Sequence, residues 1–162
     1  MYPTSGSYHQ ISYARAAKAF GSDFSFTAVT FDLRHYRTVF NDKIFAVKGL
    51  VGLGFDDMPF QIMYTLGTHI RGYQITRFLD KNIVAAQAEY RQHIAGRFGY
   101  IVSGGFGQVA EKIGKVSMGE FKSSFGVGLR FALIPEHNVN LRIDMGIGDD
   151  DSSFDINLGE AF

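Results

Sequence analysis

The sequence predicts an all-β protein, an antiparallel transmembrane β-barrel of about eight strands. Three observations lead to this prediction. Apolar residues alternate with polar or small ones, several alternating runs reach about 10 residues, and tight turns alternate with longer links. The 162 residues include 19 Gly, 16 Phe and 8 Tyr, which suits closely packed strands. We expect one domain, residues 1–162, with no separate periplasmic domain.

The alternation is clearest near the C-terminus. In the run 139–148 every second residue is apolar: Val139, Leu141, Ile143, Met145 and Ile147. The residues between them are charged, polar or glycine, so one face of a strand is apolar and the other is not. The same period predicts strands at residues 8–15, 25–39, 44–55, 82–93, 98–109, 125–133 and 154–162.

Periodicity alone does not separate a soluble barrel from a membrane barrel, in which apolar residues face lipid and polar ones face the interior. Strand length favours a membrane barrel, because several predicted strands reach about 10 residues. Strands of soluble proteins usually have about 5–6 residues, and a tilted membrane strand needs about 9–11. Loop lengths favour it too. Tight turns are predicted at residues 40–43, 94–97 and 135–138, and other links at residues 20–23, 56–81, 110–122 and 148–153. An even strand number then puts both termini on the periplasmic, short-turn side.

Composition argues against several other classes of function. The 16 basic and 16 acidic residues balance, so nucleic acid is not an expected partner. Cysteine is absent, and the five histidines lack metal-ligand spacing. Residues 149–151 are three aspartates, a weak calcium candidate that we interpret as a solvated loop. We therefore expect no enzyme activity, no metal and no cofactor. No signal peptide and no apolar run long enough for a membrane helix are visible.

Several short motifs, in a specific order, resemble the superfamily of outer-membrane insertases and two-partner-secretion transporters (the BamA, TamA and FhaC families and the bacterial surface antigens). The resemblance extends from about residue 59 to residue 162, and residues 3–55 resemble the strands that precede the loop. The matching segments are Leu66-Gly67, Ile70-Arg71-Gly72-Tyr73, Ala88-Glu89-Tyr90-Arg91, Gly126-Val127-Gly128-Leu129-Arg130-Phe131, Asn140-Leu141-Arg142-Ile143-Asp144 and Leu158-Gly159-Glu160-Ala161-Phe162.

The resemblance implies that Arg71, Gly72 and Tyr73 form the tip of an extracellular loop, around residues 56–81, that folds into the barrel interior. In the family this arginine contacts acidic residues on the next two strands. Glu89 stands at the first of these positions, and Ser103 replaces the acid at the second.

Further residues are expected to line the interior, and others to face lipid. The expected interior partners are Arg91, Arg130, Arg142 and Asp144. The expected C-terminal assembly signal, on the outward apolar face of the last strand, is Phe154, Ile156, Leu158 and Phe162.

The function implied by the resemblance is insertion or transport of polypeptides at the bacterial outer membrane, through an unstable seam between the first and last strands. The expected partners are the lipid bilayer, nascent outer-membrane proteins and a second copy of the chain. The chain departs from the family in having about half of its strands. Two alternatives stay open: a non-transporting barrel that anchors another domain, and a soluble β-barrel that binds a small apolar ligand.

Overall fold

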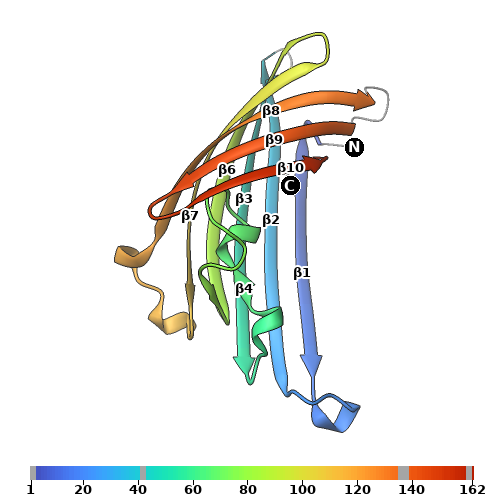
Figure 1. The fold of residues 1–162 in the computed structure, drawn as a ribbon. Helices are drawn as coiled ribbons and strands as arrows, with labels where there is room; N and C mark the ends of the chain where they lie inside the picture. Colours follow the sequence, from blue (N-terminus) through green and yellow to red (C-terminus); the bar gives the residue numbers. More distant parts are fainter. Residues whose placement is uncertain (1–2, 41–42, 135–138, 160–161) are drawn as a thin grey trace.

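The computed structural model describes residues 3–40, 43–134, 139–159 and 162. Its main feature is one antiparallel sheet of eight strands, in the order β1-β2-β3-β6-β7-β8-β9-β10 (Figure 1). These strands are β1 (Gly6–Ala16), β2 (Phe26–Phe40), β3 (Lys43–Asp56), β6 (Asn82–Ala95), β7 (Phe98–Ala110), β8 (Lys122–Ile134), β9 (Val139–Gly148) and β10 (Ser152–Leu158). The prediction of an all-β fold with eight long antiparallel strands is confirmed.

Residues 57–81, here called the inserted loop, connect β3 to β6. Two short strands in this loop, β4 (Tyr64–Thr65) and β5 (Leu79–Asp80), pair with each other. Short 3-10 turns lie in the loops: η1 (Lys18–Phe20), η2 (Phe60–Ile62), η3 (Leu66–Thr68), η4 (Ile113–Lys115) and η5 (Met118–Glu120). In the part of the chain that is described, no helix is long and apolar enough to span a membrane.

The two faces of the sheet have opposite character. Large apolar side chains are exposed on the outer face, among them Phe31, Leu33, Phe45, Val47, Phe125, Leu129, Met145, Ile147, Phe154 and Ile156. Polar and charged side chains are buried on the inner face, among them Lys48, Gln87, Glu89, Arg91, Ser103, Arg130 and Asp144. A soluble protein buries apolar residues and exposes polar ones, so the distribution on this sheet is the reverse of that in a soluble protein. It does not fit a soluble barrel with an apolar ligand cavity.

The sheet is strongly curled but does not close. Among the described residues, β1 pairs only with β2, and β10 pairs only with β9. In Figure 1, β8, β9 and β10 cross in front of β1 and β2 instead of running beside β1. The predicted eight antiparallel strands are present, but they form a curled, open sheet and not a closed barrel. The interior of an eight-stranded barrel is just filled by side chains, and here that space also has to hold the inserted loop.

The inserted loop is held inside the curl by a small apolar core. Leu66, Ile70 and Tyr73 are each at most 2% exposed and pack with Leu50, Ile83 and Ala85 of β3 and β6. Burying each large apolar side chain stabilises the structure by about 1.5–3 kcal/mol. The inward position of the loop, which the resemblance predicted, thus has a packing basis independent of charged contacts.

The last residue lies inside the curl and not on the outer face. Gly159 has a φ of +91°, and Phe162 beyond it is only 7% exposed. Its ring lies 6.4 Å from that of Tyr36 on β2. The expectation that Phe162 continues the outward apolar row is wrong, because the strand ends at Leu158 and the Phe162 ring packs against Tyr36 in the interior. The matched segment at Glu160 and Ala161, and the predicted turn at residues 135–138, lie outside the described residues.

Candidate functional site

The tip of the inserted loop is bound to the sheet through its backbone. The Arg71 N–H donates to Oε1 of Gln87 over 2.9 Å, and the Gly72 N–H donates to Oγ of Ser153 over 3.0 Å. Gly72 has a φ of +95°, which favours glycine. A Cβ on Gly146 of β9 would lie 2.8 Å from Cα of Gly72. The motif glycine and the strand glycine therefore permit direct backbone contact between loop and sheet.

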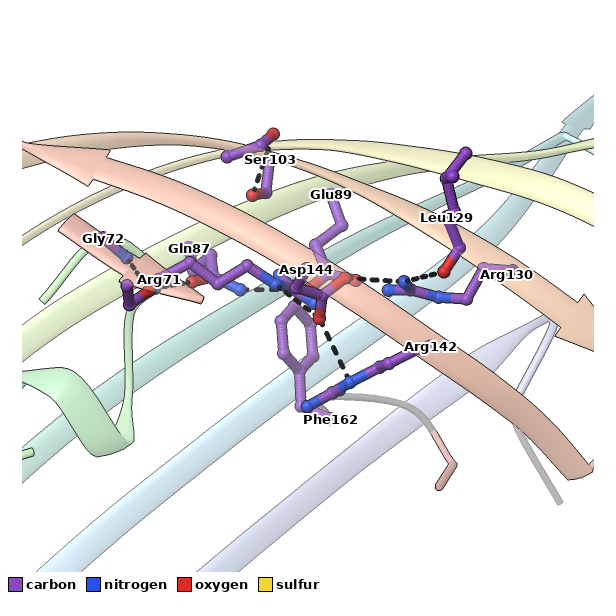
Figure 2. Close-up of polar contacts among 12 residues, drawn as sticks. Arg71, Gly72, Gln87, Glu89, Ser103, Leu129, Arg130, Arg142, Asp144 and Phe162 are labelled. Carbon is purple, nitrogen blue, oxygen red and sulfur yellow. Dashed lines mark hydrogen bonds and ion pairs between the residues drawn. The ribbon is translucent and has the colours of Figure 1, made fainter. Parts of the chain in front are cut away.

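The Arg71 side chain is almost fully buried between two carboxylates. Its Nη1 pairs with Oε1 of Glu89 on β6, and its Nε donates to Oδ2 of Asp144 on β9 over 3.1 Å (Figure 2). Arg71 is 8% exposed, Glu89 0% and Asp144 1%. A buried charge is costly unless it is paired, and charge-assisted hydrogen bonds to a guanidinium are among the strongest in proteins. The two carboxylates thus allow a loop arginine to occupy the interior.

Three further arginines from the sheet join the same two carboxylates. Nη1 of Arg130 lies 2.6 Å from Asp144, and Nε of Arg142 lies 3.1 Å from it. Nε of Arg91 donates to Glu89 over 2.8 Å. We call this set the ionic network: Arg71, Glu89, Arg91, Arg130, Arg142 and Asp144. It connects the loop tip to β6 and to the neighbouring strands β8 and β9, with β7 between β6 and β8 in the sheet (Figures 1 and 2).

Ser103 lies beside this network without joining its ion pairs. It is directly opposite Glu89 in the β6–β7 register, and its hydroxyl donates to the carbonyl of Gly126 over 3.3 Å. Asp144, two strands further along the sheet, supplies the second carboxylate that the family pattern places at position 103. The sequence placed Asp144 among the expected interior partners but did not assign it to Arg71 specifically. The only available signal was that both residues carry charge and face inward.

Tyr73 completes the attachment of the motif. Its side chain is 2% exposed, and its ring meets that of Phe78 edge-on at 5.5 Å. The Tyr73 hydroxyl donates to the carbonyl of Ser123 and accepts the backbone N–H of Asp149 over 3.2 Å. Its contacts fasten the loop to β8 and to the link between β9 and β10.

The aspartates of the β9–β10 link bind neighbouring loop groups. Asp149 accepts both the N–H and the hydroxyl of Ser123, and Asp151 accepts the N–H of Gln74. These donors hold the pKa of each carboxyl below its usual value. Within the described residues, no group of three or more acidic or histidine side chains is arranged to hold a metal ion. The carboxylates at 149 and 151 thus have a structural use in securing the loop.

His69, next to the motif, is a titratable group in the loop. Burial, with the nearby Lys48 charge as a smaller contribution, lowers the pKa of His69 from 6.5 to about 4. Asp32 opposes the shift and Arg34 adds to it. The His69 ring is therefore neutral at physiological pH, and sequence reasoning gave it no role.

The predicted C-terminal assembly residues divide into two groups. Phe154, Ile156 and Leu158 are 64%, 59% and 68% exposed on the outer face. Phe162 instead lies in the interior, where its carbonyl accepts Nη2 of Arg91 over 3.0 Å. The Arg91 guanidinium and the Lys48 ammonium lie 5.4 and 5.8 Å from the centre of its ring. The end of the chain is therefore attached to the ionic network.

Comparison with known proteins identifies the family of the chain. No curated protein matches the chain. A family model, that of the Omp85 superfamily domain, matches residues 1–162. The match covers all of the residues and confirms the resemblance drawn from the motifs around Arg71, Glu89 and the C-terminal strands. The chain therefore belongs to the Omp85 superfamily.

Proposed function

We propose that this protein is a β-sheet protein of the bacterial outer membrane that assists the insertion or translocation of polypeptides, without catalysing a chemical reaction. Its termini would lie on the periplasmic side. Membership of the Omp85 superfamily supports the location in the outer membrane and the general role in polypeptide insertion or translocation. The exposed apolar outer face supports lipid contact, because a membrane barrel presents apolar side chains to lipid and polar ones to its interior.

The observation that carries the proposal is the pair of unpaired sheet edges. Along the free lateral edges of the sheet, β1 and β10 present backbone N–H and C=O groups that no other described strand binds. An exposed edge is a template for another strand. In hydrocarbon, unsatisfied backbone groups cost several kcal/mol each, so a nascent strand that pairs there gains free energy. Edge pairing is thus a physical route by which the sheet promotes folding of a client barrel.

A second candidate function is a non-transporting structural barrel that anchors another domain. The filled interior favours this alternative, because the inserted loop and the ionic network occupy the space that a channel would need. The two functions differ in whether the sheet edges are used. An anchor has no need of an accessible edge.

The test is reconstitution of the purified chain in liposomes. We expect vesicles that contain the chain to speed the folding of an unfolded outer-membrane barrel client, measured by the heat-dependent gel shift of the client. The control vesicles contain a closed eight-stranded barrel, which has the same outer surface type but no edge. If the chain floats with the vesicles but neither speeds folding nor conducts ions, the anchoring function replaces the insertion function.

A further inference from the structure

We propose that two copies of this chain join edge to edge, β10 of each with β1 of the other, to form one closed barrel that encloses both inserted loops. The inference rests on the membrane location proposed above but not on the insertion activity. It starts from the unpaired edges. β1 has 11 residues and β10 has 7, and neither contains proline. Soluble proteins usually protect such edges, and in lipid an open edge is not tolerated.

Closure within a single chain is opposed by the contents of the curl. An eight-stranded barrel has room only for its own side chains. Here the backbone of the inserted loop lies against the sheet, so closely that a Cβ on Gly146 would lie 3.0 Å from the carbonyl carbon of Arg71. Phe162 also occupies the interior. Direct pairing of β1 with β10 would require expelling the loop and its buried core.

A second copy satisfies both edges without moving the loop. The first and last strands of an eight-stranded antiparallel sheet run in opposite directions. Two copies with the same orientation in the membrane therefore meet β10 to β1 in antiparallel fashion at both seams, and a two-fold rotation closes the ring. A barrel of about sixteen strands encloses an aqueous lumen, which is wide enough to hold more than side chains. A single client strand would leave other edges open.

The faces of the two edge strands match across such a seam. Pairing places Ser153, Asp155 and Asn157 on the inner side of β10, opposite inner residues of β9. On β1 the inner row is Tyr8, Gln10 and Ser12, opposite the inner residues of β2. The outer rows are Phe154, Ile156 and Leu158 on β10, and Ile11 and Tyr13 on β1. Joining the strands continues the polar inner row and brings the apolar residues of the two outer rows together, although the outer row of β1 also holds Ser7, His9 and Arg15.

The difference in strand length reconciles this assembly with insertion activity. The 7 residues of β10 cannot cover all 11 residues of β1. Each seam is thus no longer than the 7-residue β9–β10 pairing and leaves part of β1 accessible. The seam is where a client strand would compete with the partner copy.

Disulfide trapping tests the assembly directly, because the chain has no cysteine. One preparation carries Asn157→Cys on β10, and the other carries a single cysteine at one of three β1 positions: Tyr8→Cys, Gln10→Cys or Ser12→Cys. Each pair is mixed before reconstitution into vesicles and oxidised. We expect at least one mixture to give a disulfide-linked dimer on a non-reducing gel. Each variant alone is the matched control and should give no disulfide-linked dimer, since identical positions lie on different sides of the shared barrel.

Two outcomes would overturn the proposal. A double variant, Gln10→Cys with Asn157→Cys, that forms only an internal disulfide would show closure within one chain. The absence of any cross-link in samples that float with the vesicles would show that no second copy occupies the edge. Flotation is read on the same samples, so a protein that does not float at all contradicts the membrane location and not the pairing.

Discussion

Asp144 should be the most sensitive position of the ionic network, because a single carboxylate serves three guanidiniums. It pairs with Arg71, Arg130 and Arg142, and it is 1% exposed. The substitution Asp144→Asn keeps the side-chain volume and removes the charge. Breaking a buried ion pair by removing one partner typically costs about 3–5 kcal/mol. The amide oxygen of Asn can still accept one hydrogen bond, so we expect a loss of about 3 kcal/mol in the free energy of unfolding.

The matched control is Asp155→Asn on the neighbouring strand. Asp155 lies directly opposite Asp144 in the β9–β10 register, so the two carboxylates share the inner face. Like charges directly opposite each other destabilise a sheet, by roughly 0.2–1 kcal/mol. The same chemical change should therefore leave stability unaltered or raise it by up to about 1 kcal/mol at position 155.

Urea titration of the protein in detergent micelles, followed by circular dichroism, measures both variants; the chain has no Trp to serve as a fluorescence probe. The reasoning fails if Asp144→Asn costs less than about 1 kcal/mol, well below the range for a broken buried pair, or if Asp155→Asn costs as much. A second arm uses Ser103→Asp in the Asp144→Asn background. It returns a carboxylate to the β7 position beside Arg71, and we expect part of the lost stability to be recovered.

Three further predictions concern the loop and the chain end. Gly146→Ala should cost about 1–3 kcal/mol by overpacking against Gly72, whereas Gly49→Ala, where the added methyl meets open space, should be near neutral in the same titration. The folded-state pKa of His69 lies below its unfolded value, so the contribution of the neutral ring to the free energy of unfolding is present above pH 6.5 and is lost as the pH falls toward about 4. The substitution His69→Asn should therefore reduce the loss of stability between pH 6.5 and about 4, by up to about 3 kcal/mol. Phe162→Ala should cost about 3 kcal/mol or more in the unfolding titration, and an unchanged midpoint would contradict the interior position of the ring.

The strands and their faces were predictable from the sequence because each strand carries its own signal. Alternation of apolar and polar residues has a period of two, and one run such as residues 139–148 is enough to reveal it. Which face points outward was predicted from the length of the alternating runs and from the family resemblance: apolar residues outside, charged residues inside. These are local properties, and the structure agrees with them in all eight strands, with the exception of Phe162 beyond the end of β10.

The contact between Arg71 and Asp144 was not predictable in the same way. The two residues are 73 positions apart and come from a loop and a strand that are neighbours only in the curled sheet. The family pattern pointed to position 103, where this chain has serine. Which inward carboxylate reaches the arginine depends on the curvature of the whole sheet. For the same reason the sequence could not show that the edges stay apart or that Phe162 turns inward.

The contacts of the loop tip span the interior of the curled sheet. The tip is attached to Gln87 and Glu89 on β6, to Asp144 on β9 and to Ser153 on β10, and Phe162 joins the chain end to Arg91. No described pairing joins β1 to β10, so the ends of the sheet are not fixed by backbone hydrogen bonds to each other. The inserted loop bridges β6 on one side of the curled sheet and β9 and β10 on the other. Its contacts link β6 to β9 and β10 across the interior, and its buried side chains occupy the space between them.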